Sequence, residues 1–328
     1  GRVGILDADI HGPSLPVMVS LPDDALPVRR SATTKLLKPV EVDGIKMMSF
    51  GFVAKGAAAG DPSPAIVRGP VASTTVQQIA SGTDWGPLDY LVVDFPPGTG
   101  DIPLSLIQSV GITAAVAVTT PGRLAAADVA KGLDLFRESR VPVVAIVENL
   151  AHFEDDRGVR HRVFGASHVD RLLERVNGGP GGAPPGGALS MADVVSVPID
   201  AAVTDAVEAA RPVLTPGASG AAAQAFRQLA EHVARRCAAL RQRAADVPKV
   251  TYSEATGTIT LRYLSGAREG QEVEVSPRAL RAQSRDAATA AARAGPEGEK
   301  DLPADLRPVA IEPRGSYGVG LTRGGRHS

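Results

Sequence analysis

Two short segments place carboxylates beside glycines directly after apolar runs. Asp7 and Asp9 follow the first apolar run of the chain, and Asp94 follows Tyr90–Val93, with Gly98 four residues later. In an open sheet of parallel strands, ligands bind at the carboxyl ends of the strands. A carboxylate there can hold Mg²⁺ or its water, and a glycine N–H can approach a terminal phosphate. The pattern favours a nucleotide-hydrolysis site.

Each segment has a plainer explanation when it is taken alone. The stretch from Asp94 to Gly98 contains Pro-Pro-Gly and is also typical of a turn, while Asp7 and Asp9 could cap a turn or a helix. The two segments together favour the site.

Several short apolar runs alternate with helical patterns along the first two thirds of the chain. Continuous runs of this kind suit strands that are buried on both faces of a parallel sheet, which predicts a doubly wound α/β fold. The expected strands are Val3–Leu6, Tyr90–Val93, Ala114–Val118, Val143–Val147 and Val194–Val197. The expected helices are Pro103–Ser109 and Leu124–Ser139, the second with Leu124, Val129, Leu133 and Phe136 on its apolar face.

Other segments complete this first domain, predicted as residues 1–246. Val40–Met47 resembles a hairpin on an Asp-Gly turn, which we interpret as a local insertion. Gly178–Gly187 is rich in glycine and proline and predicts a surface loop. A long closing helix to Ala245 carries Cys237 on its apolar stripe.

The remaining residues, 247–328, predict a small β-rich domain. The apolar period changes to two at Val250, and Thr258–Tyr263 follows after a turn. Further strands are expected at Glu272–Val275, Val309–Glu312 and Tyr317–Thr322, with a loop or frayed helix at Ala287–Lys300.

Composition excludes several classes of function. Lys and Arg number 35 against 36 Asp and Glu, a net charge of −1, so no whole-chain field favours nucleic acid or a membrane. No apolar run approaches the roughly 20 residues that span a bilayer. The single cysteine excludes an internal disulfide and an all-cysteine metal site within one chain. No targeting segment is visible, and the chain starts inside a strand-like run without Met, so we expect that N-terminal sequence has been lost.

The carboxylate segments and five further motifs resemble the Mrp/ApbC branch of the MinD-like deviant P-loop ATPases. The resemblance covers about Gly1 to Val213. The matching segments are Asp7–Pro16, Met47–Phe52, Val67–Pro70, Trp85–Asp101, Val118–Pro121, Val141–Leu150 and Arg211–Val213. The resemblance implies an ATP-dependent carrier of [4Fe–4S] clusters that acts as a homodimer and delivers clusters to apo-proteins.

The resemblance also implies roles for individual residues. Asp9 would sit near the attacking water and Asp94 would be the Mg²⁺ carboxylate, acting through water. Asp7, Gly12, Gly98 and Thr99 would help bind the nucleotide, Gly98 and Thr99 as part of switch II. Asn149 would read the adenine edge.

Two departures from the family pattern limit these implications. The Gly-Lys-Gly-Gly-Val-Gly-Lys-Ser/Thr phosphate loop and its strand would precede Gly1, and no segment replaces them, so we expect these residues alone to bind ATP poorly or not at all. Many relatives have a Cys-x-x-Cys after the segment that matches Glu148–Leu150, and this chain has none. Cys237 is a weak candidate ligand, and His152, His161 and His168 match no ligand spacing.

The second domain resembles a small domain shared with the N-terminal region of γ-butyrobetaine hydroxylase, through Val250–Leu261 and Ile311–Val319. An Mrp-type ATPase joined to this module is similar to the plastid high-chlorophyll-fluorescence scaffold type, which implies the chloroplast stroma. A non-hydrolysing adaptor of the same fold remains the alternative. A membrane-positioning ATPase fits less well, because the C-terminal Arg323–Arg326 is too short and glycine-rich to bury an apolar face.

Overall fold

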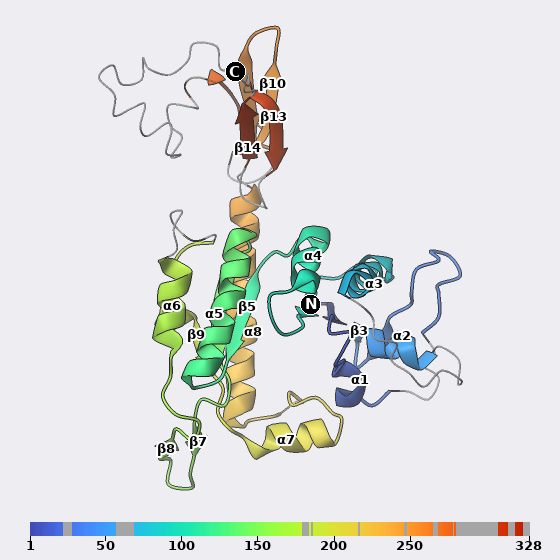
Figure 1. Ribbon diagram of the computed structural model, residues 1–328, viewed down its shortest axis with the longest axis vertical. Coiled ribbons are helices and arrows are strands. Elements are labelled where there is room, and N and C mark those ends of the chain that lie inside the picture. The colour runs from blue at the N-terminus through green and yellow to red at the C-terminus, as the bar shows by residue number, and fades with distance from the viewer. Residues whose placement is uncertain are drawn as a thin grey trace. The chain divides into compact units, whose positions relative to one another are not determined.

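The computed structural model forms two compact units, residues 1–234 and 235–328. It describes residues 1–21, 28–56, 69–178, 184, 186–215, 217–245, 248–264, 268–277, 279, 308–313 and 319–323. The division falls inside the long helix α8 (Ala221–Ala245), which Figure 1 shows as the longest helix of the chain. The predicted boundary at 246/247 stays a prediction.

The first unit contains a four-stranded sheet that carries the carboxylate segments. Its strands are β1 (Val3–Asp7), β2 (Val40–Val42), β3 (Ile45–Ser49) and β4 (Tyr90–Asp94), in the order β2-β3-β1-β4. The central strand β1 pairs in parallel with both β3 and β4. The parallel pairing brings the carboxyl ends of these three strands to one edge of the sheet.

The predicted hairpin at Val40–Met47 is present, but its interpretation as a local insertion was wrong. Its two strands pair antiparallel across Asp43 and Gly44, whose φ values of 51° and 77° are those of a tight hairpin turn. The second strand, β3, then pairs in parallel with β1 and so belongs to the main sheet. Met47, Met48 and Ser49 are buried there. A short apolar run does not itself specify a distant partner strand.

A second sheet of the same unit contains β5 (Ala115–Thr119), β6 (Val143–Glu148) and β9 (Val194–Ser196), all parallel. All six residues of β6 are buried, as expected for the centre of such a sheet. β4 ends the first sheet and β5 ends the second. Val92 on β4 and Val118 on β5 are 53% and 56% exposed, so both terminal strands present apolar side chains to solvent.

Helices cover these sheets and complete the predicted α/β fold. They are α1 (Leu15–Met18), α2 (Phe50–Gly56), α3 (Gly69–Gly82), α4 (Asp101–Val110), α5 (Arg123–Glu138), α6 (Val169–Asn177), α7 (Ala201–Glu208) and α8, with a 3₁₀ turn at Met191–Asp193. Helices α5 and α6 lie side by side (Figure 1). Helix α4 contributes to two cores, through Leu106 to that of the first sheet and through Ile107 to that of the second. Phe95 packs on both, and its ring meets Phe136 edge to face at 6.0 Å.

The expected apolar face of α5 is only partly correct. Leu133 is buried, whereas Leu124 is 81% exposed and makes no part of the core. Periodicity locates a face along a helix but cannot show where the neighbouring elements stop covering it. Among the described residues, no helix has the length and apolar content to cross a bilayer.

The second unit is β-rich, as predicted. Strands β10 (Lys249–Ser253), β11 (Thr258–Arg262) and β12 (Glu272–Val275) form an antiparallel sheet, and β13 (Pro308–Pro313) pairs antiparallel with β14 (Val319–Arg323). The expected loop at Ala287–Lys300 and most of the Gly178–Gly187 tract lie outside the described residues.

Candidate nucleotide-binding site

Asp7 is the structural centre of the carboxylate edge. It is buried at the end of β1, where its Oδ1 accepts a hydrogen bond from the Asp9 amide at 3.1 Å. Its Oδ2 accepts from the Leu15 amide at 3.2 Å and from the Ser49 hydroxyl at 3.0 Å. The Asp7 carboxylate therefore joins β1, the end of β3 and the following loop into one unit.

The loop after β1 is shaped by Asp9. Its Oδ1 accepts hydrogen bonds from the amides of His11 at 3.0 Å and Gly12 at 3.2 Å, an arrangement by which Asp commonly closes a turn. The same loop and α1 pack closely on α2, because a Cβ added to Gly51 would lie 3.2 Å from a ring carbon of Pro13 in the loop and 2.7 Å from one of Pro16 in α1. Asp9 thus holds His11 and Gly12 close to itself at the exposed edge of the sheet.

Asp94 ends β4 directly beside Asp7. The two residues are partners in the parallel register, and the Ala8 amide donates to the Asp94 carbonyl at 3.0 Å. Partial burial raises the pKa of the Asp94 carboxyl, and the negative charges of Asp7 and Asp9 raise it further. Ionised Asp94 is therefore destabilised by its surroundings, and a cation beside it would relieve that destabilisation.

The turn after β4 is exposed from Pro97 to Gly100. Gly98 has φ +93°, a conformation that L side chains rarely adopt, and no heavy atom lies within 4 Å of an added Cβ. Thr99 is also exposed. Helix α4 follows with Gly100 as its N-cap and without a side-chain cap, which leaves the first backbone N–H groups of α4 available to solvent or an anion.

Asn149 lies in the other sheet, directly after β6. Its backbone N–H donates to the Thr119 carbonyl at 2.8 Å, and its side-chain Oδ1 accepts from the Leu150 amide at 3.0 Å. Leu150 has φ +55°, which marks a sharp change of chain direction at this point. With Oδ1 already bonded, the Nδ2 group of Asn149 is the part of its side chain that can donate to a ligand.

The structure brings some of the predicted residues together and leaves others apart. Asp7, Asp9, Gly12 and Asp94 gather at the carboxyl edge of the first sheet. Gly98 and Thr99 follow on the turn to α4. In the described part of the chain, no hydrogen bond or ion pair joins Asn149 to this group, because Asn149 follows β6 of the second sheet and the group lies at the edge of the first.

Two polar residues near these strand ends were not predicted from the sequence. Ser49 is completely buried and holds Asp7, and Glu148 is a buried carboxylate next to Asn149. Nothing in the pattern marked Ser49, because its partner lies 42 residues away. Glu148 could have been noticed as a charged residue that ends an otherwise apolar strand.

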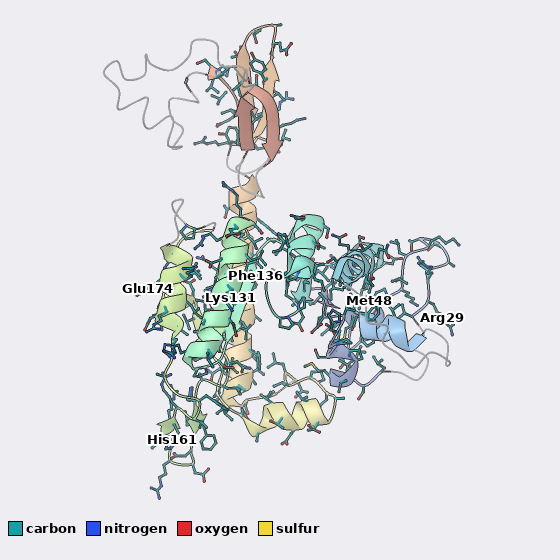
Figure 2. The ribbon with its side chains drawn as sticks, viewed as in Figure 1. Arg29, Met48, Lys131, Phe136, His161 and Glu174 are labelled. Carbon is teal, nitrogen blue, oxygen red and sulfur yellow. The ribbon has the colours of Figure 1, made fainter. Side chains whose placement is uncertain are left out.

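No ready-made metal ligand set occurs in the described regions: no three or more His, Cys, Asp or Glu side chains there are placed to hold a metal ion. Cys237 is buried, and burial raises the pKa of its thiol, which disfavours the thiolate that binds metals. His161, labelled in Figure 2, lies on the small hairpin of β7 (Phe153–Glu154) and β8 (Arg160–His161). Its Nε2 lies 2.8 Å from Asp155 Oδ2.

Known proteins resemble the chain along nearly its whole length. The family model described as ParA, NUBPL iron-transfer P-loop NTPase, matches residues 1–234. The chain is 36% identical over 323 residues to "Fe-S cluster assembly factor HCF101, chloroplastic" of Oryza sativa subsp. japonica, covering 98% of this chain and 56% of that protein. It is also 36% identical over 233 residues to "Iron-sulfur cluster carrier protein" of Haemophilus influenzae, covering 71% of this chain and 57% of that protein.

A solved nucleotide-binding protein in complex with ADP from Archaeoglobus fulgidus is 29% identical, with a TM-score of 0.47 over 66% of this chain and 76% of that chain. The chain spans a little over half the length of the two curated relatives. From the match over residues 1–234, the chain belongs to the ParA family of P-loop NTPases, in its NUBPL iron-transfer group.

Proposed function

We propose that the protein is a nucleotide-dependent carrier or scaffold that delivers [4Fe–4S] clusters to apo-proteins. Family membership and the iron–sulfur names of its relatives support this function. The single observation that carries the nucleotide part is Asp94, which lies beside Asp7 in register and whose pKa is raised by burial and by two neighbouring carboxylates. That environment favours a bound divalent cation.

The residues at the carboxyl edge fit Mg²⁺ and ATP in distinct ways. Asp94 would hold Mg²⁺ through water, and Asp9 would orient the attacking water, since its Oδ2 accepts no hydrogen bond from the described residues. Backbone N–H groups at Gly98 and Thr99 would bind the terminal phosphate. Gly12, which lies beside Asp9, would also contact the nucleotide. Asp7 would position the loop. Bound Mg²⁺ would supply charge neutralisation at the phosphates.

Asn149 would read the adenine edge. Its Nδ2 is a donor, and its Oδ1 is oriented by the Leu150 amide, so one face of the amide is already fixed. A donor held in this way suits a ring nitrogen of the base.

We propose further that the strand carrying the phosphate loop pairs between β4 and β5. Both strands end their sheets, and both expose a valine at mid-strand. Strands of a parallel sheet are normally buried on both faces, so exposure of Val92 and Val118 is typical of strands that lack a pairing strand on one edge. Helix α4 and Phe95 contribute to the cores of both sheets. This shared packing supports a single added strand that pairs with β4 on one side and with β5 on the other.

The cluster is the cargo. No group of three or more ligands is found among the described residues of one chain, and we propose that a homodimer shares the cluster. The chloroplastic relative supports a plastid location, and we propose the stroma. The single cysteine of the chain, Cys237, is buried, and this favours a second candidate, an adaptor of the same fold that binds client proteins without carrying a cluster.

The test uses the full-length protein that contains these 328 residues. Anaerobic reconstitution with iron and sulfide, followed by transfer to an apo-ferredoxin, measures carriage, and phosphate release measures hydrolysis. We expect a cluster signal near stoichiometric with dimer, and hydrolysis that Asp94→Asn lowers by at least about a hundredfold while exposed Asp128→Asn does not. No retained cluster would favour the adaptor. Equal hydrolysis in Asp94→Asn and Asp128→Asn would refute the assigned magnesium site.

A further inference from the structure

Glu148 is a buried carboxylate at the end of β6 that the proposed nucleotide site does not use. Its side chain is 4% exposed, and its register partner on β5 is the buried Thr119. The backbone of Glu148 is well held, because its carbonyl accepts from the Val197 amide at 2.9 Å. The backbone at the end of β6 is therefore fixed by hydrogen bonds. The unusual feature is the pairing of the Glu148 carboxylate.

The carboxylate is incompletely paired. Its Oε1 is buried and has no hydrogen-bond partner among the described residues, and its Oε2 lies 3.8 Å from Nη1 of Arg162. That distance is an ion pair but is too long for a hydrogen bond. The neighbouring Val147 belongs to an apolar core with Val195 and Val197. A charge in such surroundings is costly unless it is both paired and hydrogen-bonded.

Arg162 comes from a short protruding segment, residues 153–164, which we call the arm. Within it β7 pairs with β8, and the segment after it is tied to the start of α5, where the Gly122 amide donates to the Ala166 carbonyl at 3.2 Å. Two other basic side chains of the arm are engaged locally: Arg160 pairs with Glu154, and the His161 ring contacts Asp155. Arg162 instead reaches the end of β6.

The arm carries an unusual surface for its size. Its large apolar side chains are all about half exposed: Phe153, Val159, Val163 and Phe164. The arm has little core of its own, since both of its short strands are exposed. Its position must therefore be set by contacts at its base rather than by internal packing.

We propose that Glu148 is a positioning residue whose buried carboxylate anchors Arg162, and that this pair holds the arm and its apolar surface at the turn that contains Asn149. A guanidinium is the one side chain whose fork can serve both carboxylate oxygens at once. The pairing of Glu148 with Arg162 is inferred from the contacts above. Only its relevance to nucleotide binding rests on the proposed function, which assigns the neighbouring Asn149 to the adenine edge.

Arm mobility tests the proposal without nucleotide or cluster. A nitroxide attached to Val159→Cys, in a Cys237→Ser background of the full-length protein, reports the motion of the arm by its EPR line shape. We expect Arg162→Ala to raise the mobile fraction about twofold or more, since the arm loses its anchor. Arg162→Lys should restore part of the order by returning the charge. Arg160→Ala, which removes an exposed pair inside the arm, is the matched control and should leave the spectrum unchanged.

Thermal unfolding supplies the second readout. Arg162→Ala should lower the Tm, because it leaves Glu148 buried and unpaired, and adding Glu148→Gln should restore most of that loss while the arm stays mobile. A role in packing alone predicts additive losses instead. Unchanged mobility in Arg162→Ala, or a double variant less stable than Arg162→Ala alone, would overturn the proposal, whatever the outcome of the nucleotide experiments.

Discussion

Asp7 and Asp94 are register partners on the neighbouring parallel strands β1 and β4, yet their carboxylates differ in burial and in hydrogen bonding. Asp7 is buried and accepts three hydrogen bonds, whereas Asp94 has a raised pKa and faces the open edge of the sheet. One carboxylate builds the edge and the other remains available for a ligand. The first two predictions follow from this difference.

Asp94→Asn should stabilise the ligand-free protein near pH 7. Folding raises the Asp94 pKa, so this group favours the folded state when protonated, and that contribution is lost as pH rises through the folded pKa. The gain should be roughly 1 kcal/mol or less, because the carboxylate is partly solvent-exposed. Tm values measured from pH 4 to pH 7 should differ most at the upper end. Asp128→Asn on α5 is the control, and a lower Tm for Asp94→Asn at pH 7 would contradict the assignment.

Asp7→Ala should destabilise the first unit by about 3 kcal/mol, because it removes the acceptor for two amides and a buried hydroxyl. Ser49→Ala removes one of these bonds and should cost about 1 kcal/mol. Urea unfolding followed by circular dichroism gives both values. Equal losses in the two variants would show that the amides of Asp9 and Leu15 do not depend on Asp7.

Asp134 joins α5 to α6 through Arg175, and Arg137 also pairs with it at 2.7 Å. The hydrogen bond from Arg175 is the main reason why the pKa of Asp134 is lowered. A lowered folded pKa stabilises the protein above the unfolded pKa, and that contribution disappears as pH falls through the folded pKa. Arg175→Ala should therefore cost about 1 kcal/mol at pH 7 and less near pH 3.

Lys131→Ala is the matched control for this ion pair, because Lys131 pairs with Asp128 on the exposed side of α5. It should change the free energy of unfolding by no more than about 0.5 kcal/mol. An equal effect of the two substitutions at pH 7 would show that Asp134 contributes nothing beyond an ordinary surface pair.

Cys237 should react slowly with iodoacetamide in the native protein. Its thiol is buried, and burial raises its pKa, so little thiolate is present and little is accessible. Alkylation at pH 8 should be at least about tenfold slower than in urea-unfolded protein. Exposed Val159→Cys provides the comparison of a reactive thiol in the same chain. Rapid native alkylation of Cys237 would argue for an accessible, ligand-competent thiolate.

Local chemistry explains why much of the fold was predictable. The runs that became β1 and β6 are apolar because they lie inside parallel sheets, and those of β4 and β5 are equally apolar although each now ends its sheet. The turn before β3 was recognisable from the two residues Asp43 and Gly44. The carboxylates Asp7 and Asp94 were found because they end such runs.

What the amino-acid sequence determined by itself was therefore the type of the strands β1, β4, β5 and β6 and of the helices α4, α5 and α8, and the place of Asp7 and Asp94 at strand ends, since these depend on near neighbours. The tertiary structure decided the parallel pairing of β3 with β1, the exposure of Leu124, the hydrogen bond of Ser49 to Asp7 and the ion pair of Glu148 with Arg162. Each of these depends on which distant segment arrives at a given surface, and residue periodicity carries no information about that.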